Sequence, residues 1–166
     1  MTGTAEDSTS DGFVRGRTGP GAITLDHVSL RVPDYDDSVR WYREVLGLPI
    51  VLEWTDPALP GLRLCHLRLG TTKLELIGGG SPVQRDPVDT VADHLQPAGV
   101  VHLCMTVDDL ARTSAHLLTQ DVHPMDGPLY VDALDITLIL VKDNAGNVLE
   151  ISQAGRLLAD SGVSDR

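Results

Sequence analysis

The chain contains an internal repeat with an offset of 75 residues, and this repeat restricts the fold more than any other feature of the sequence. His27 lies near the start of an apolar stretch, and His102 lies in a similar stretch 75 positions later. Glu75 and Glu150, each placed between apolar residues, show the same offset. Each histidine is therefore followed 48 positions later by a glutamate. Such self-similarity predicts two copies of one structural unit that pack against each other.

Each copy has the pattern of one strand, one helix and three further strands. Apolar residues alternate with polar ones in the expected strands and recur at helical spacing in the expected helices, and turns rich in glycine, proline and aspartate separate them. In the first copy we expect strands at 23–32, 49–54, 62–69 and 72–77 and a helix at 35–46. In the second copy we expect strands at 100–107, 122–124, 134–142 and 148–152, a helix at 108–119 and a turn at Gly127-Pro128. We therefore predict an α+β fold in which two tandem βαβββ modules form a curved, eight-stranded mixed sheet with helices on its outer face.

The chain divides into five predicted segments. These are a disordered leader at 1–21, the first module at 22–78, a linker at 79–98 with a short helix near 87–95, the second module at 99–153 and a loose tail at 154–166. The leader is rich in Gly, Ser, Thr and Asp and has no apolar period, which is typical of segments that cannot bury a core. The linker begins with a run of glycines, which favours a break between the modules.

The composition limits the classes of partner. The net charge is −11, and 42% of the residues are hydrophobic. An acidic excess argues against nonspecific binding to nucleic acid or to an anionic membrane, since both need a basic face. No stretch approaches the ~20 apolar residues of a membrane span, and the two cysteines do not indicate a disulfide framework. We expect a cytoplasmic protein with a small-molecule partner.

The four repeated polar residues are expected on one face of the sheet. Side chains alternate between the two faces of a strand, so His27 and Leu30 point in opposite directions. The leucine-rich face must pack under the helix, and His27 then points into the hollow of the sheet. The same alternation turns Glu75 inward, and the repeat places His102 and Glu150 in the same way.

These four residues have the composition of a metal site. A single histidine at a strand start is usually structural, but a glutamate between leucines must be exposed, paired or metal-bound, because burying an unpaired carboxylate is costly. The shared offset favours metal binding, and two imidazoles with two carboxylates suit divalent Mn, Fe, Co, Ni or Zn. We predict one divalent metal ion held by His27, Glu75, His102 and Glu150. Four protein ligands on an octahedral ion leave two positions, which suit a substrate with two neighbouring oxygen atoms.

At this point the chain resembles the vicinal oxygen chelate superfamily, also called the glyoxalase, bleomycin-resistance and dioxygenase superfamily. The resemblance extends over about residues 23–153. It is carried by the segments LDH (25–27), VPD (32–34), WYREVLGL (41–48), LEL (74–76), VHL (101–103), VDDL (107–110) and DNAGNVLE (143–150). It implies paired βαβββ modules, one divalent metal ion and a homodimer, which would also cover strand edges that proteins rarely leave exposed.

Within the superfamily, the middle of the chain is most similar to methylmalonyl-CoA epimerase. The similar segments are LGTTKLELI (69–77), SPV (81–83) and GVVHL (99–103). The resemblance implies an epimerase or isomerase that moves a proton next to a carbonyl group through a metal-bound enolate, on an acyl-CoA thioester or a cyclitol or sugar-like ketone. Some epimerases of that family have a glutamate base on the strand that corresponds to 62–65. This chain has no carboxylate there, and His66 is the nearest titratable residue.

Three alternatives within the superfamily stay open. A glyoxalase I-type lyase of the bacterial kind uses the same order of histidine and glutamate ligands. An extradiol dioxygenase uses two histidines and one carboxylate, so a fourth protein ligand argues against it. A non-enzymatic drug-binding protein of the bleomycin-resistance type fits the acidic charge, but such proteins typically lack the four metal ligands.

Other residues are assigned weaker roles. The candidate catalytic bases are Glu75, Glu150 and His66, and the candidate substrate-binding residues are Lys73, Arg68 and Tyr130. Lys73 shares the parity of Glu75, and Tyr130 is expected in a loop that covers the site. The remaining histidines have no counterpart at the repeat offset, so we interpret them as structural or surface residues: His94, His116 and His123.

Overall fold

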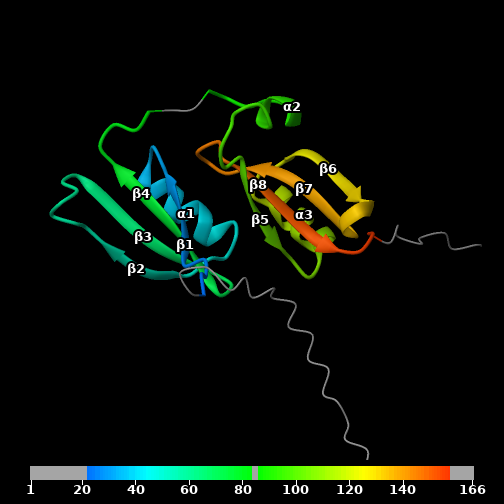
Figure 1. The fold of residues 1–166 in the computed structure, drawn as a ribbon, viewed down its shortest axis with the longest axis horizontal. Helices are drawn as coiled ribbons and strands as arrows, with labels where there is room; N and C mark the ends of the chain where they lie inside the picture. Colours follow the sequence, from blue (N-terminus) through cyan, green and yellow to red (C-terminus); the bar gives the residue numbers. More distant parts are fainter. Residues whose placement is uncertain (1–21, 84–85, 158–166) are drawn as a thin grey trace, which may run out of the picture.

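The computed structural model describes residues 22–83 and 86–157. Its first half contains β1 (His27–Arg31), α1 (Tyr35–Glu44), β2 (Ile50–Trp54), β3 (Leu62–Leu69) and β4 (Thr72–Gly79). Its second half contains α2 (Val91–His94), β5 (His102–Thr106), α3 (Leu110–Thr119), β6 (Pro124–Val131), a short 3-10 turn η1 (Asp132–Leu134), β7 (Ile136–Lys142) and β8 (Val148–Ala154). The predicted order of one strand, one helix and three strands is confirmed in both halves (Figure 1).

The eight strands form two mixed sheets with the same topology. The strand orders are β1-β4-β3-β2 and β5-β8-β7-β6. In each sheet the first strand runs parallel to the last one, and the other pairs are antiparallel. The register repeats as well, because Ser29 lies opposite Glu75 and Cys104 lies opposite Glu150. The 75-residue repeat is therefore a structural repeat.

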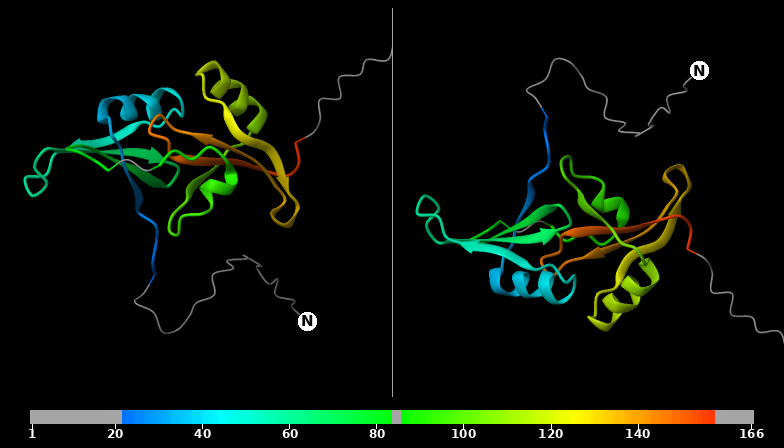
Figure 2. Two further views of the ribbon diagram at one scale, coloured as in Figure 1. Left: turned by 90° about the horizontal axis from the view of Figure 1, so that it is seen from above. Right: turned by 90° about the horizontal axis from the view of Figure 1, so that it is seen from below.

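The two long helices lie on one side of the sheets, and α2 lies on the other (Figure 2). Both long helices begin with an aspartate at the same place in the repeat. The Asp34 side chain accepts a hydrogen bond from Asp37 N at 2.9 Å, and Asp109 accepts one from Arg112 N at 2.8 Å. Such N-caps satisfy backbone donors that the first helical turn leaves free. Gly47 has a φ of +67° just after α1, a conformation that glycine adopts readily.

The helix-facing side of the first sheet is apolar, as its alternation predicts. Leu74 and Leu76 are fully buried beneath α1. Tyr35 of α1 approaches Gly78 so closely that a Cβ atom at this glycine would lie 2.3 Å from the Cβ of Tyr35. Close packing on this face leaves Glu75, which lies between the two leucines, to point to the opposite face.

The two modules share one hydrophobic core and several polar contacts. The buried core cluster combines residues of both halves, including Tyr42 from α1 and Leu117 from α3. The Tyr42 hydroxyl donates a hydrogen bond to Asp143 Oδ2 at 2.6 Å, inside the protein. Nε2 of His116 lies 2.9 Å from the carbonyl oxygen of Val45. Burial, with the charge of Asp143 next, raises the pKa of Tyr42, so its hydroxyl stays a donor.

A second, smaller core forms on the opposite face of the second sheet. Leu138, Leu140 and Val148 are buried there, and Val91 of α2 packs against them. The helix α2 begins at Thr90, whose side chain accepts a hydrogen bond from Asp93 N at 3.1 Å. This cap and the apolar contact place α2 over the sheet.

Several boundaries differ from the sequence-based expectations. The predicted short strand at 122–124 is wrong, because β6 continues to Val131 and includes the expected turn at Gly127-Pro128. Its pairing with β7 shifts register on both sides of Asp126, which accommodates the two residues in a strand. Tyr130 consequently lies in a strand, and its predicted loop is also wrong.

The limits of the predicted segments are only partly described. The helix expected at 87–95 is shorter, at Val91–His94, while β4 and β8 each extend one residue beyond the predicted module ends. The predicted leader at 1–21 and most of the predicted tail lie outside the described residues. In the described part of the chain, no helix has the length and apolar character needed to cross a membrane.

We predict that Tyr42→Phe lowers the free energy of unfolding by about 1–3 kcal/mol, because it leaves the buried Asp143 carboxylate without one of its donors. Chemical denaturation followed by circular dichroism measures this change. Tyr130→Phe is the matched control, since the Tyr130 hydroxyl bonds Asp135 in an exposed pair and its loss should cost less than about 0.5 kcal/mol. Equal effects of the two variants would contradict a special role for the Tyr42–Asp143 contact.

Candidate functional site

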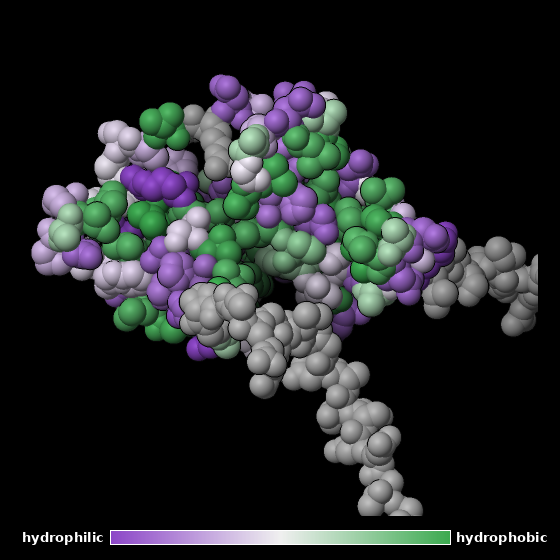
Figure 3. Space-filling view, viewed as in Figure 1, coloured by the Kyte–Doolittle hydropathy of each residue, from purple (hydrophilic) through white to green (hydrophobic). Residues whose placement is uncertain are grey.

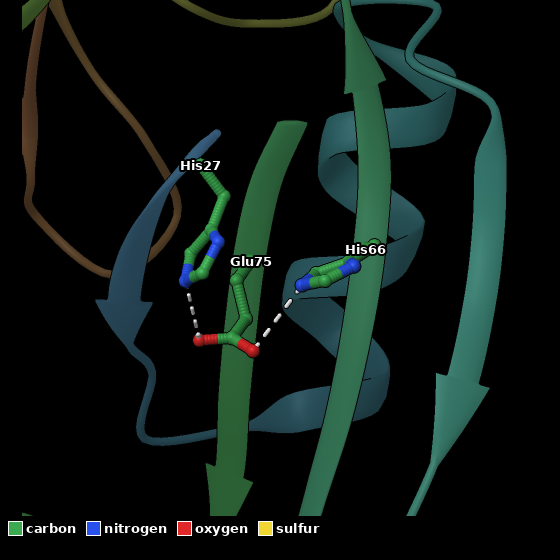
Figure 4. A group of neighbouring side chains, drawn as sticks. All are labelled: His27, His66 and Glu75. Carbon is green, nitrogen blue, oxygen red and sulfur yellow. Dashed lines mark ion pairs between the residues drawn. The ribbon is translucent and has the colours of Figure 1, made fainter. Parts of the chain in front are cut away.

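Three side chains of the first sheet converge on its open face. His27, His66 and Glu75 come from β1, β3 and β4, and one ligand atom of each lies within 4.8 Å of the others (Figure 4). Nε2 of His27 lies 3.8 Å from Glu75 Oε2, and Nε2 of His66 lies 3.3 Å from Glu75 Oε1. Glu75 therefore lies between the two imidazoles and presents one carboxylate oxygen to each.

The strand register explains why these residues meet. His66 lies directly opposite Glu75 in the antiparallel β3–β4 pair, and their side chains leave the sheet on the same face. Ser29, two residues after His27 in β1, lies opposite Glu75 on its other side. Trp54 of β2 contacts the His66 ring edge to face, with the ring centroids 4.7 Å apart. The aromatic wall limits the directions in which the His66 ring can point.

Glu75 is a buried carboxylate with few compensating groups. Only 8% of the residue is exposed. The Ser29 hydroxyl donates a hydrogen bond to Oε2 of Glu75, and the imidazoles of His27 and His66 lie next to the carboxylate. A buried charge needs a paired or coordinated partner to offset its lost hydration. A cation at this position would supply that compensation.

His66 also has an unused ligand atom. Its Nε2 is buried and makes no hydrogen bond within the described part of the chain, although Glu75 Oε1 lies at ion-pair distance. Buried polar atoms are rarely left without a partner, and such an exception is explained by a bound water, an ion or a catalytic role. The residues present therefore fit a divalent ion: His27, His66 and Glu75 offer two imidazole nitrogens and a carboxylate in one small volume.

The second sheet carries a related but different pair. Nε2 of His102 lies 3.3 Å from Glu150 Oε2. Adjacent ligands that each bind an ion at about 2.1 Å are themselves about 3 Å apart, so this spacing is compatible with chelation. Cys104 replaces the serine of the first module and donates its thiol hydrogen to Glu150 Oε1 at 3.0 Å.

The third strand distinguishes the two half-sites. We define the first half-site as His27, His66 and Glu75, and the second half-site as His102 and Glu150. In the second sheet, the residue opposite Glu150 on β7 is Leu140. Leu140 therefore takes the place that His66 has in the first half-site. The two modules therefore share the histidine and the glutamate but differ in the residue that lies opposite the glutamate on the third strand.

The two half-sites are separate groups within the described residues. Neither His102 nor Glu150 joins the first half-site within 4.8 Å. A cavity of about 470 Å³ lies where the modules meet, and both Ser29 and His102 line it. Arg31 lines it as well. Figure 3 shows apolar and polar residues side by side on the surface at this junction. Binding of one ion by all four repeated residues stays a prediction.

His27 and His102 each have a partner on the second ring nitrogen. Asp26 Oδ2 lies 2.9 Å from Nδ1 of His27, and Asp26 Oδ1 lies 2.9 Å from Nζ of Lys73. The hydrogen bond with His27, followed by that with Lys73, lowers the pKa of Asp26 to about 2. In the second module, Nε2 of His94 lies 3.1 Å from Nδ1 of His102. Burial, with the charge of His102 next, lowers the pKa of His94.

The predicted substrate-binding residues are dispersed. The Lys73 ammonium is engaged with Asp26. Arg68 is exposed and lies opposite Lys73 in the sheet. The Tyr130 hydroxyl donates to Asp135 at 2.8 Å, and the Arg156 guanidinium lies 3.9 Å from its ring centre. The structure therefore brings His66 to the proposed metal ligands and gives Lys73 and Tyr130 other partners.

Sequence reasoning missed four neighbours of the half-sites: Asp26, Ser29, Trp54 and Cys104. A signal existed for two of them, because Ser29 and Cys104 are each two residues beyond the repeated histidine and must share its face. Nothing in the sequence indicates that Trp54 contacts His66, because that contact depends on the pairing of β2 with β3.

Known proteins resemble this chain in sequence and in structure. Human mitochondrial methylmalonyl-CoA epimerase is 26% identical over 137 residues, which cover 78% of this chain and 73% of the relative. A 2-epi-5-epi-valiolone epimerase from Actinomyces sp is 31% identical over 119 residues, covering 63% of each chain. A glyoxalase family protein from Enterococcus faecalis has a TM-score of 0.64 at 21% identity, covering 78% of this chain and 96% of that chain, which shows a common fold.

The family match extends over both modules. Residues 24–151, from just before β1 to the first half of β8, match one family description. This range includes both half-sites and the helix α2 between the modules. The repeated topology and the paired histidines and glutamates are thus parts of one domain type, and the chain belongs to the Glyoxalase/Bleomycin resistance protein/Dioxygenase superfamily.

Proposed function

We propose that the protein is a divalent-metal-dependent epimerase or isomerase that transfers a proton next to a carbonyl group. The observation that carries this proposal is the first half-site, where a buried carboxylate and two imidazoles converge and Nε2 of His66 has no hydrogen-bond partner among the described residues. Relatives named as epimerases support the reaction type. No cofactor that transfers hydride is required for such a proton transfer.

The proposed ligands are His27, Glu75, His102 and Glu150. A divalent ion bound there would act as a Lewis acid and stabilise negative charge that develops on a substrate oxygen. The chain's own groups orient these ligands: Ser29 and Cys104 donate to the carboxylates of the two glutamates. A hydrogen bond of this kind leaves the remaining carboxylate oxygen free to bind or to accept a proton.

His66 is the proposed base. Its ring packs against Trp54, and its Nε2 faces the Glu75 carboxylate. A neutral imidazole accepts a proton near physiological pH without large changes in its surroundings. Glu75 and Glu150 are the other candidate bases, but each would have to combine this role with that of a metal ligand.

The proposed substrates are an acyl-CoA thioester and a cyclitol or sugar-like ketone. Both types are named in relatives of this chain. The cavity between the modules is lined by apolar residues together with two cationic residues, Arg31 and Lys142, and one acidic residue, Asp86, so it offers hydrocarbon surface and cationic groups to a substrate. Arg31 already donates to the carbonyl oxygen of Ile77 at 2.7 Å, which holds its charge at this edge.

A second candidate is an extradiol dioxygenase. The specific observation that favours it is the composition of the first half-site, because two histidines and one carboxylate form the ligand set of many non-haem iron oxygenases. In this alternative, His66 is a metal ligand and the second half-site does not contribute. The two candidates therefore assign opposite roles to His66 and to His102.

We predict that His27→Ala, Glu75→Ala, His102→Ala and Glu150→Ala each weaken metal affinity at least about 100-fold, since loss of an outer-shell partner alone costs about 10–100-fold. The measurement is competition for Zn²⁺ with a chromophoric chelator, supported by elemental analysis of the purified variants. His123→Ala is the control, because the His123 side chain is exposed and its polar partner is Asp121, which is not a proposed ligand.

The pattern of losses separates the two candidates. If His102→Ala retains full, tightly held metal while His66→Ala loses it, the ion belongs to the first half-site alone and the four-ligand proposal is wrong. If His66→Ala retains the metal, His66 is available as a base.

We predict that the protein, loaded in turn with Mn, Fe, Co, Ni or Zn, washes deuterium from heavy water into an epimerisable substrate. Methylmalonyl-CoA and 2-epi-5-epi-valiolone are the first compounds to test, with mass spectrometry as the readout. His66→Gln should slow exchange by about 10²–10⁴, the usual contribution of a general base, without loss of metal. Oxygen consumption with a catechol, and no exchange in any ketone or thioester tested, would favour the dioxygenase.

We also predict a homodimer. The outer strands β1, β2, β5 and β6 end their sheets in the described chain, and proteins usually cover such edges. Light scattering coupled to size-exclusion chromatography measures the mass directly. A monomer at micromolar concentration would remove this prediction without affecting the assignment of the ligands.

A further inference from the structure

His94 is a buried histidine that contacts a proposed metal ligand. It is 4% exposed, and its Nε2 lies 3.1 Å from Nδ1 of His102. The two ring planes are tilted by 32° and their centroids are 5.4 Å apart, so the rings do not stack face to face. The contact is made between the two ring nitrogens. Buried polar side chains are generally placed by their hydrogen bonds. The contact with His102 is therefore a specific feature of this position.

In the first module, a carboxylate contacts the corresponding ring nitrogen of the histidine. There, Asp26 Oδ2 lies 2.9 Å from Nδ1 of His27. The 75-residue offset places Val101 at the position equivalent to Asp26, and a valine side chain cannot accept a hydrogen bond. The helix α2 instead brings His94 to the corresponding nitrogen of His102. Two unrelated residues thus contact equivalent ring atoms in the two modules.

The chemistry of imidazole decides what His94 can do. A neutral histidine has one N–H group and one lone pair, and a metal ion takes the lone pair. Nε2 of His102 lies 3.3 Å from Glu150 Oε2 and is the nitrogen on the side of the second half-site. When this nitrogen binds an ion, Nδ1 must carry the hydrogen. His94 Nε2 is the acceptor within reach.

The placement of α2 holds His94 in this position. Thr90 caps the helix, and Val91 packs on the buried residues Leu138, Leu140 and Val148. These contacts anchor the helix independently of the His94–His102 contact. The segment between the modules therefore contributes a fixed side chain to the second half-site.

We propose that His94 is a positioning residue whose Nε2 accepts a hydrogen bond from Nδ1–H of His102 and thereby directs the Nε2 lone pair of His102 toward a divalent cation. This inference rests on the proposed metal site and adds the residue that orients one of its ligands. The expected effect is about 10–100-fold in metal affinity, the usual cost of losing an outer-shell partner.

The test compares His94→Leu with His94→Gln in the full chain. Leucine retains bulk without an acceptor, whereas the Oε1 atom of glutamine can occupy a place close to that of Nε2 and can accept a hydrogen bond. We expect Zn²⁺ affinity to fall about 10–100-fold in His94→Leu and to recover substantially in His94→Gln. His123→Ala is the matched control, because the His123 side chain is exposed and pairs with Asp121, which is not a proposed ligand.

Nitrogen NMR of the histidine rings gives a readout that does not depend on activity. In the zinc-loaded protein we expect His102 to be protonated at Nδ1 and metal-bound at Nε2, with a slowly exchanging Nδ1–H signal. This signal should be lost to rapid exchange in His94→Leu and retained in His94→Gln. Thermal unfolding of the metal-free variants reports any change in stability separately.

The outcomes are distinct. Wild-type affinity in His94→Leu would overturn the proposal, and so would equal losses in both variants, which would indicate a packing role. A wild-type protein that binds no zinc through His102 would overturn both this proposal and the metal site. The protein could also bind zinc through His102, lose affinity in His94→Leu and recover it in His94→Gln, yet exchange no substrate proton. That result would support the role of His94 and contradict the proposed epimerase activity.

Discussion

The alternation of side chains along β4 determines how the rest of the structure is arranged. Leu74 and Leu76 must be buried under α1, and the residue between them has to leave the sheet on the other side. That residue is Glu75, whose carboxylate is buried as well. Hydrophobic burial on one face thus places a charge in a confined position on the other. The neighbouring histidines and Ser29 are then arranged around this charge.

The fold was predictable where local patterns and tertiary pairing agree. The strand β3 has the bounds that its alternation predicts, and α1 begins at the expected residue, Tyr35. The strand β6 was not predictable, because Asp126, Gly127 and Pro128 read locally as a turn. Pairing with β7 overrides this local preference, with a register shift on each side of the irregular residues.

The part of the candidate site that was predictable from the sequence consists mainly of residues related by the 75-residue offset. The offset predicts His27, Glu75, His102 and Glu150 as candidate ligands, and alternation predicts that the histidine and glutamate of each module share one face of its sheet. The resemblance to the epimerases, and not the repeat, pointed to His66 as the nearest titratable group on the third strand, and the structure places it beside Glu75. The contact between His94 and His102 could not be read from the chain, because α2 reaches the sheet through apolar packing that has no counterpart in the repeat. Histidines without a repeat partner were interpreted as structural or surface residues for that reason.

The exchange of His66 for Leu140 makes the protein chemically asymmetric despite its duplicated architecture. Two modules with the same strands, caps and register would, if identical, surround a bound molecule with matching functional groups. Here one half offers an imidazole opposite its glutamate, and the other offers only hydrocarbon at the corresponding place. A molecule held between such halves would meet the His66 imidazole from one module and the Leu140 side chain from the other. The repeated architecture therefore gives the two sides of the junction unequal chemistry through one position on the third strand of each module.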